Sequence, residues 1–505
     1  MKKLLFFLIL PITLFSQNKA INASTQWIEE NGADMIHEYA QFLKLPNHAS
    51  NIIDINKNAE FLKNGFSKRG FEMQLLKLPD APPIVYGERK VPGAKRTYCF
   101  YIHYDGQPVD PEAWKHEPFN PTLYDNAMNK GGKKIDFPKS GEKIGKEWRV
   151  YARSASDDKA PFLTLWSAID ALNNSDIPFS SNIKLFFDGE EESSSPNVMK
   201  YLEKYSELFD DIDVWLLNDG AIFQTGQPQF KFGGRGVTSL ELTVFGANAS
   251  LHSGHYGNWA PVPGQMIARL LTSMKSEDGT VLIDGFYDSV IPISEYEREQ
   301  INNIPNIDEH LKRELGLSFT EGNNQNLFER VLMPSLTIRG LSSGNVGEKS
   351  RNVIPSIATA TLGMRLVKGN DPEKMIDLVE KHIKSQGWHI TYKDPDEKTR
   401  NTYPKIVKVK RNPNGFPAGK INMDDPTVRP IIEAVKKHIN PNIVLLSSSG
   451  GSNRIYQIIW EVLDKPGISV NMVNHDNNQH AANENLRLGN LWYGINLMAL
   501  LLTME

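Results

Sequence analysis

Apolar residues repeat along the chain with different periods, and the periods predict an alternation of helices and strands. Segments 27–46 and 58–73 carry apolar residues at helical spacing, and a further helix is predicted from Pro161, with Phe162, Leu165, Trp166, Ile169 and Leu172 on one stripe. Four short apolar runs indicate buried strands: "TYCFYIHYD", "NIKLFF", "VWLLND" and "ISVNMVNHD". Strands that alternate with helices predict an α/β fold, with a mostly parallel sheet covered by helices.

The pattern changes between residues 238 and 412. "TSLELTVFG" and "ATATLGMRLV" alternate as half-exposed antiparallel strands do, whereas "VPGQMIARLLTSM" and "PEKMIDLVEKHIKSQG" have helical spacing. We therefore predict a smaller α+β domain at 238–412, inserted into a larger domain formed by 17–237 and 413–505. The Lys- and Gly-rich stretch 125–147 is interpreted as a surface insertion, and a solvated loop is its simplest explanation.

The first residues, "MKKLLFFLILPITLFSQ", have two lysines, a short apolar run and a polar end. This layout is typical of a signal peptide, assigned to 1–16, and an N-terminal membrane anchor is the alternative. We expect an exported protein, periplasmic or secreted, with no stable membrane insertion after signal removal. Cys99 is the only cysteine, so the chain forms no internal disulfide.

Composition narrows the possible partners. The chain has 505 residues, 40% of them hydrophobic, which is enough for a large core and two domains. Its 56 Lys and Arg residues nearly balance 60 Asp and Glu residues. A nucleic-acid-binding protein usually has a basic excess, so we expect no nucleic-acid partner.

Polar side chains follow several predicted strands where those strands end. In open α/β sheets, ligands bind beyond the carboxyl ends of the strands. The residues at these ends and ahead of the Pro161 helix are His103, Asp105, Asp157, Asp158, Glu191, Glu192, Asp219, His475 and His480. A mixed set of imidazoles and carboxylates suits zinc, with manganese or cobalt as substitutes.

Each of these motifs has a simpler explanation when it is taken alone. An acidic triplet such as "EEE" at 190–192 can be a solvated helix face, and His103 can be a structural histidine. Asp157 and Asp158 can cap the following helix. The conjunction of the motifs favours a metal site, because clustered carboxylates lose their mutual repulsion when they surround cations.

The motifs also resemble those of a known family. "IHYDGQPVDPEAW", "YARSASDDKAPFL", "DGEEESSS", "LLNDG", "SLHSGHYGN", "RNVIPSIATATLGMRLV" and "QHAANENLRL" occur in this order. They are similar to motifs of the co-catalytic zinc metallopeptidases and amidohydrolases that include carnosine-type dipeptidases, carboxypeptidase G, acetylornithine deacetylase and succinyl-diaminopimelate desuccinylase. The form "HYDGQPVDP" is nearest to the dipeptidase branch.

The resemblance implies a role for each residue of the larger domain. Asp157 would bridge two zinc ions, and the other ligands would be His103 and Asp219 at one ion and Glu192 and His480 at the other. A hydroxide between the metals would be the nucleophile, Glu191 the general base and acid, and Asp105 the carboxylate that orients His103. The peptide bond Asp157–Asp158 is expected to be cis.

The resemblance also assigns functions to the inserted domain, as a lid and dimerisation domain. His252 would act across a homodimer on the substrate carbonyl of the partner subunit. Arg365 would bind the terminal carboxylate of the substrate, with Gly451 and Ser452 of "SSSGGSNR" as further substrate-binding residues. A hinge would close the two domains over the substrate.

The predicted function is therefore an exported dizinc hydrolase that cleaves an amide bond. A dipeptidase or carboxypeptidase acting on peptides is the first hypothesis. A deacylase acting on N-acyl amino acids is the second, and the two chemistries share a site. A non-catalytic binding protein of the same fold is the alternative from a different class.

Overall fold

The computed structural model describes residues 13–322 and 325–504, and its chain divides into two compact units. Unit 1 comprises the described residues up to Phe232, Ile421–Leu446 and the residues from Ile458 onward. Unit 2 comprises Gly233–Lys420 and Ser447–Gln457. The sequence predicted 238 and 412 as the limits of the inserted part.

Unit 1 is built on an eight-stranded mixed sheet with the order β1-β2-β7-β3-β8-β20-β9-β19. Its strands are β1 (Glu72–Leu76), β2 (Ile84–Arg89), β3 (Thr97–His103), β7 (Asn182–Asp188), β8 (Val214–Leu217), β9 (Gln229–Lys231), β19 (Val444–Leu446) and β20 (Gly467–Val470). The four central strands β7, β3, β8 and β20 are parallel, and antiparallel pairings lie on both sides of them. Every residue of β3 is buried, as expected for a central strand.

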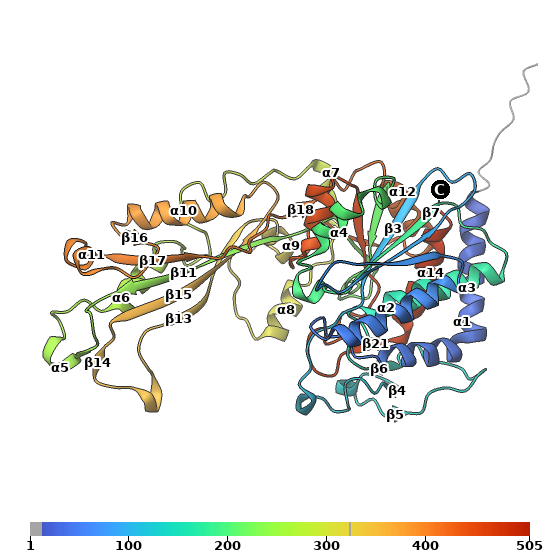
Figure 1. Cartoon of the computed structure of the whole chain (residues 1–505), viewed down its shortest axis with the longest axis horizontal. Coiled ribbons are helices and arrows are strands. Elements are labelled where there is room, and N and C mark those ends of the chain that lie inside the picture. The colour runs from blue at the N-terminus through green and yellow to red at the C-terminus, as the bar shows by residue number, and fades with distance from the viewer. Residues whose placement is uncertain (1–12, 323–324, 505) are drawn as a thin grey trace, which may run out of the picture. The chain divides into compact units, whose positions relative to one another are not determined.

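Helices of unit 1 pack together from distant parts of the sequence. α1 (Thr13–Leu43), α3 (Lys159–Asn174) and α14 (Leu488–Leu502) contact one another, and α2 (Ile52–Ser67) contacts β1 and β2 (Figure 1). α3 begins two residues before the predicted Pro161, which lies in its first turn, where a missing N–H costs nothing. Unit 1 also contains the α-helices α4 (Val198–Lys204) and α12 (Arg429–His438).

A second, antiparallel sheet of unit 1 contains part of the Lys-rich stretch. Its order is β21 (Asn485–Arg487), β6 (Arg149–Tyr151), β4 (Thr122–Tyr124) and β5 (Lys134–Ile135). The lysines of 130–146 are exposed. Residues 1–12 of the predicted signal peptide lie outside the described residues. Within the described ranges, no helix is both long enough and apolar enough to cross a membrane.

Unit 2 is an α+β structure with a five-stranded sheet. The sheet has the order β13 (Ser335–Ser342), β15 (Ile357–Leu366), β11 (Gly236–Phe245), β17 (Ile406–Arg411) and β16 (His389–Thr391), and only the last pair is parallel. The predicted helices are α6 (Pro263–Thr272) and α10 (Pro372–Ser385), which pack on this sheet around a core that includes Leu240, Leu362 and Ile376.

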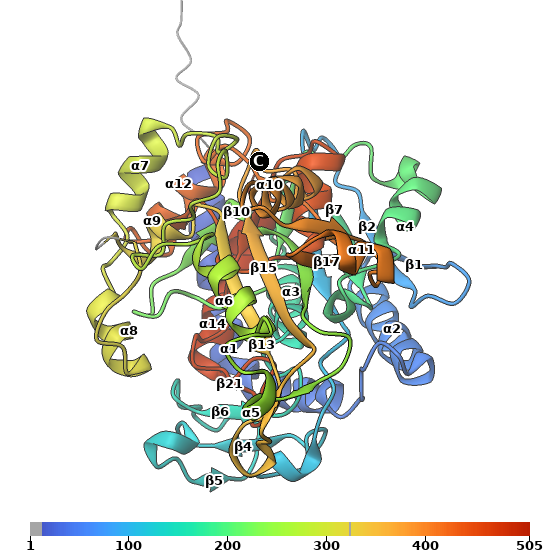
Figure 2. The ribbon, with the colours of Figure 1, turned by 90° about the vertical axis from the view of Figure 1, so that its left-hand side faces the viewer.

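Short elements complete unit 2. They are the pairs β10 (Gly233–Gly234) with β18 (Gly419–Lys420) and β12 (Leu251–His252) with β14 (Val353–Ile354), and the helices α5 (Ser253–Tyr256), α7 (Glu295–Asn302), α8 (Asp308–Leu315), α9 (Leu327–Arg330), α11 (Glu397–Thr402) and α13 (Arg454–Gln457). Figure 2 shows α7, α8 and α9 along one side of the unit. The predicted combination of an α/β part and an inserted α+β part is confirmed.

Candidate metal centre

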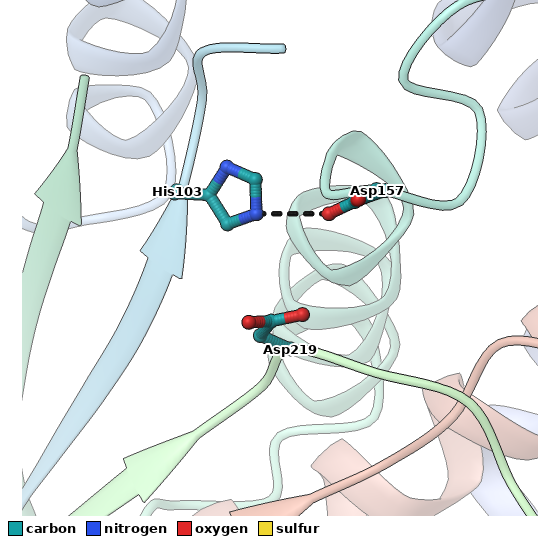
Figure 3. Close-up of side chains that lie close together, drawn as sticks. All are labelled: His103, Asp157 and Asp219. Atoms are coloured by element: carbon teal, nitrogen blue, oxygen red, sulfur yellow. Dashed lines mark hydrogen bonds and ion pairs between the residues drawn. The ribbon is translucent and has the colours of Figure 1, made fainter. Parts of the chain in front are cut away.

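Three separate elements of unit 1 bring His103, Asp157 and Asp219 together. His103 is the last residue of β3, Asp157 precedes α3, and Asp219 follows β8. Each offers one ligand atom, and these atoms lie within 4.8 Å of one another. His103 Nε2 is 3.0 Å from Asp157 Oδ1 (Figure 3). This group matches one of the two predicted metal sites.

A second group shares the same aspartate. Asp157, Glu192 and His480 also place one ligand atom each within 4.8 Å of the others. His480 Nε2 lies 2.9 Å from Asp157 Oδ2 and 3.3 Å from Glu192 Oε2. The two oxygens of Asp157 therefore face two different histidines, as a carboxylate that bridges two cations requires. The peptide bond after Asp157 is cis, as the resemblance predicted.

Asp105 holds two parts of the centre in place. Its oxygens accept hydrogen bonds from the backbone N–H groups of Glu191 and Glu192, each at 3.0 Å. Asp105 Oδ1 also lies 3.3 Å from His103 Nδ1. A carboxylate on this nitrogen leaves Nε2 as the ligand atom and fixes the orientation of the ring. Asp105 thus contacts both His103 and the backbone of the acidic triplet.

Glu191 lies beside the first group, with Oε2 3.9 Å from His103 Nε2. Burial holds the pKa of the Glu191 carboxyl well above its usual range, and neighbouring carboxylates add to this effect. Burial and the Asp157 charge raise the pKa of Glu192 to about 7. A carboxyl with a raised pKa can both accept and return a proton near neutral pH.

The two histidines and Asp157 change one another's pKa values, and each change favours the charged form. Burial alone would lower the pKa of His103, but hydrogen bonds to Asp105 and Asp157 hold it well above its ordinary value. Burial would likewise raise the pKa of Asp157, whereas His103 and His480 lower it. The centre therefore keeps Asp157 ionised despite its nearly complete burial, as a metal ligand must be.

The donor set fits two divalent cations. Each group contains one imidazole and two carboxylates when the shared Asp157 is counted in both. Among the described residues, Glu192 Oε1 is buried and has no hydrogen-bond partner. An unpaired buried carboxylate oxygen is costly, and a cation would satisfy it. Nitrogen and oxygen ligands in this number suit zinc.

Glu484 is a residue of the site that the sequence reasoning did not single out. It is fully buried, and its carboxylate accepts five hydrogen bonds from the loop that ends in Asp157. The donors are Arg153 Nη1, the backbone N–H groups of Ser154, Ser156 and Asp157, and the Ser156 hydroxyl, at 2.7–3.0 Å. Glu484 therefore joins the segment that carries His480 to the loop that carries Asp157. The available signal was an acidic residue only four positions after His480.

Gln107 is a second residue that was missed. Its side-chain amide donates a hydrogen bond of 2.6 Å to Glu192 Oε2. It lies in the quoted motif "IHYDGQPVDPEAW", four residues after His103. His475, by contrast, is exposed and belongs to neither group of candidate ligands.

The remaining predicted residues belong to unit 2. His252 is exposed and caps α5, since its Nδ1 accepts a hydrogen bond of 3.1 Å from Gly254 N–H. Its ring stacks on that of His255, with 4.3 Å between the centroids. Arg365 Nη1 donates to Ser452 Oγ at 2.6 Å, so these two predicted substrate-binding residues are in contact. Gly451 lies next to Ser452, and its carbonyl accepts a hydrogen bond of 3.0 Å from Arg235 N–H.

Comparison with known proteins agrees with this geometry. Residues 99–504 match the model of peptidase family M20/M25/M40. The chain is 28% identical over 338 residues to the Cys-Gly metallodipeptidase of Schizosaccharomyces pombe, covering 64% of this chain and 67% of that protein. It is 25% identical over 434 residues to the β-Ala-His dipeptidase of Homo sapiens, covering 84% of this chain and 78% of that protein.

A solved structure of the same family has a similar fold. The crystal structure of an M20 family metallo-carboxypeptidase from Sulfolobus solfataricus superposes with a TM-score of 0.71 at 27% identity, covering 93% of this chain and 98% of the other. The predicted resemblance to dipeptidases and carboxypeptidases is thereby confirmed. The chain belongs to peptidase family M20/M25/M40 and is a hydrolytic metalloenzyme.

Proposed function

We propose that the protein is a dizinc amide hydrolase that acts as a dipeptidase or carboxypeptidase. The observation that carries this proposal is the bridging position of Asp157, whose two oxygens face His103 and His480. Glu191 lies beside that carboxylate, where a proton acceptor is needed. A site that only stored or transported metal would not need such a neighbour.

Five residues would hold the metals. His103 and Asp219 would bind one ion, Glu192 and His480 the other, and Asp157 both. Bound zinc ions, or manganese or cobalt in their place, would polarise the amide carbonyl and make an attacking water more acidic.

The side chains of the protein perform the proton transfers. Glu191 takes a proton from the attacking water at a carboxylate oxygen and passes it to the leaving nitrogen as the amide bond breaks. Asp105 keeps His103 in one orientation through Nδ1 and holds the Glu191 N–H, so the base and the ligand are fixed by the same carboxylate. Glu484 holds the loop of Asp157 through its buried hydrogen bonds.

Recognition of the substrate would fall to unit 2. We assign the substrate's terminal carboxylate to Arg365, because a guanidinium matches a carboxylate in charge and shape. Arg365 is held by Ser452, and Gly451 precedes Ser452. The relatives are named for Cys-Gly and β-Ala-His dipeptides, so both belong among the substrates to be tried.

We further propose a homodimer formed through unit 2, with His252 donating to the substrate carbonyl in the partner subunit. The exposure of His252 supports this role, since the described residues of its own chain leave its side chain accessible. Exposed apolar side chains of unit 2, among them Trp259 at 80% and Val346 at 88%, support an interface there. We also propose export to the periplasm or medium, and this rests only on the signal-peptide pattern of residues 1–16.

One experiment tests the proposed activity and separates it from its rivals. Metal-loaded protein is incubated with a library of dipeptides, longer peptides and N-acyl amino acids, with and without a chelator. We expect turnover of dipeptides or release of C-terminal amino acids, lost with chelator and restored by zinc. Turnover of N-acyl amino acids alone would indicate a deacylase, and no turnover by a fully metal-loaded protein would indicate a binding protein.

A further inference from the structure

Unit 2 contains a cavity of about 340 Å³ that none of the proposed catalytic residues lines. This volume lies at the lower end of the range for small-molecule sites. Its wall comes from α8, α9, residues 317–321 and 325 between them, the start of β13, and Arg235, Lys275 and Gly279. The aliphatic part of the lining is Leu311, Leu315, Leu317, Leu327, Val331 and Leu336.

Helix α8 turns its apolar stripe toward this cavity instead of a packed core. Leu311 and Leu315 are one turn apart, as residues on one helix face are, and both line the cavity. No residue of α8 is buried, and Leu315 is 63% exposed. An amphipathic helix is normally stabilised by burying such a stripe. The stripe of α8 is thus available to an apolar ligand.

Arg235 provides the charged end of the cavity. Its side chain lines the cavity, yet the residue is only 8% exposed. Its guanidinium donates from Nη2 to the Met333 carbonyl at 2.6 Å and to Ser335 Oγ at 3.4 Å, and both acceptors are neutral. Nε is buried without a hydrogen-bond partner among the described residues, and both hydrogen bonds of the guanidinium to them come from Nη2.

Asp308 and Glu321 also line the cavity, but within the part of the chain that the structure describes no acidic side chain forms an ion pair with Arg235. Burial and the nearby Arg365 lower the pKa of Arg235 to about 10. Of the other cations of the lining, Lys275 pairs with Glu321 at 2.6 Å and Lys312 with Glu309 at 2.5 Å. Arg330, which also lines the cavity, donates from Nη1 to the Gln325 amide oxygen at 3.0 Å. A buried cation is normally paired, because burying it alone is costly. An anion at Arg235 would therefore be favoured.

We propose that this cavity binds an amphipathic monocarboxylate. The carboxylate would accept hydrogen bonds from Nη1 of Arg235, and the aliphatic tail would cover the stripe formed by Leu311 and Leu315. The planar donors of the buried Arg235 guanidinium suit a carboxylate in charge and shape. The site lies entirely in unit 2 and does not depend on the proposed hydrolytic activity.

Octanoate is the probe, with octanol and octylamine as uncharged and cationic controls of equal length. Binding to the metal-loaded, full-length chain is measured by titration calorimetry. We expect octanoate to bind at one site per chain and the two controls to bind at least about tenfold more weakly, since each lacks the charge-assisted contact.

Three variants locate the bound octanoate. Leu315→Glu places a negative charge in the wall at an exposed position, so it leaves folding intact, and Arg235→Gln removes the buried charge. Both should weaken octanoate binding at least about tenfold. Arg339→Gln is the matched control, because Arg339 is an exposed arginine of the same unit that does not line the cavity.

Several results would overturn the proposal. Octanoate binding that is unchanged in Leu315→Glu would place the ligand elsewhere, such as the metal centre. Equal affinity for octanol would exclude recognition of the carboxylate. Absence of octanoate binding, together with self-association that Leu315→Glu abolishes, would show that a second copy of the chain covers the stripe instead.

Discussion

The metal centre of unit 1 and the cavity of unit 2 both bury charge, but they stabilise it in different ways. At the metal centre, Asp157 is fixed by His103, His480 and the loop held by Glu484. In the cavity, the Arg235 guanidinium donates to two neutral acceptors among the described residues, the Met333 carbonyl and the Ser335 hydroxyl. Because the charged groups of the metal centre contact one another, their roles can be inferred from the residues of the chain. The second site leaves its main electrostatic partner to a ligand.

Glu191→Gln should give the largest loss of activity. It tests whether Glu191 transfers protons while its neighbour Glu192 binds metal. Turnover should fall at least about a hundredfold, because an amide cannot take the proton of the attacking water. Metal content, measured by elemental analysis, should stay at two ions per chain. Glu192→Gln should instead lose metal, since Glu192 is a proposed ligand.

Glu190→Gln is the control for this prediction. Glu190 is adjacent in sequence, but its carboxylate binds the backbone and side-chain N–H groups of Asn197. Its substitution should leave turnover within a few-fold of the wild type. Normal turnover by Glu191→Gln would show that the order of roles in the acidic triplet is wrong.

His252→Ala tests whether unit 2 contributes a catalytic group to the proposed reaction. Loss of one donor to the developing oxyanion should cost about 2.7–4 kcal/mol of transition-state stabilisation, with both metals retained. The measurement is kcat/KM on the best substrate of the library. His255→Ala removes the ring that stacks on His252 and is the matched control, with little expected effect.

Subunit exchange tests whether His252 acts across a dimer. Inactive His252→Ala and inactive Glu191→Gln are mixed and allowed to exchange. Mixed dimers should regain activity, because one of their two sites has Glu191 in one subunit and His252 from the other. If exchange is proven and no activity returns, His252 does not act in trans.

Glu484→Gln should weaken the metal centre without removing a ligand. An amide at this position donates where the loop also donates, so the backbone N–H groups of Ser156 and Asp157 would lose part of their acceptor. Metal affinity, measured by chelator competition, should fall about tenfold to a hundredfold, as for other groups that hold ligands in place. Glu380→Gln is the control for general destabilisation.

Glu380 suits this purpose because it is also a buried acid with several partners. It is 4% exposed and bonds to Arg411 and Tyr392 in unit 2. Both variants should lower the unfolding midpoint, but only Glu484→Gln should change metal affinity. Unchanged metal affinity in Glu484→Gln would assign Glu484 to stability alone.

The sequence predicted well those strands whose apolar residues are consecutive along the chain. The runs that became β3, β7 and β8 are mostly apolar, as buried central strands are, and the polar residues at their ends gave the ligand candidates. Glu484 was missed because its spacing from His480 does not specify what it contacts, and only the fold brings its carboxylate to the Asp157 N–H.

Unit 2 contains features that depend on contacts in the folded chain. Its boundary lies at Gly233 rather than 238 in the structure, because Gly233 and Gly234 pair with Gly419 and Lys420 before the long strand begins. The leucine spacing of α8 indicates an amphipathic helix, but the pattern does not specify what covers the apolar face. The cavity and its buried Arg235 emerge only from the folded chain.

Asp476→Asn should give the smallest effect and tests an ordinary ion pair beside the metal centre. Asp476 Oδ2 lies 2.8 Å from Arg149 Nη2 and Oδ1 lies 2.9 Å from Arg149 Nη1. Burial opposes ionisation of Asp476, but Arg149 holds its pKa well below the usual value. The folded state therefore binds the proton less readily than the unfolded state. Its stabilising contribution is complete above the unfolded pKa of about 3.9 and is lost as the pH falls through the folded pKa.

The substitution should cost about 1 kcal/mol at pH 7, because the carboxylate is a quarter exposed and water screens the pair. Urea unfolding from pH 7 down to pH 3 should show the difference from the wild type shrinking below about pH 4, as Asp476 becomes protonated in the unfolded chain. Asp136→Asn, at an exposed aspartate of the same unit, should show no such pH dependence. A constant difference across this range would mean that the charge of Asp476 contributes nothing, and that only its hydrogen-bonding shape matters.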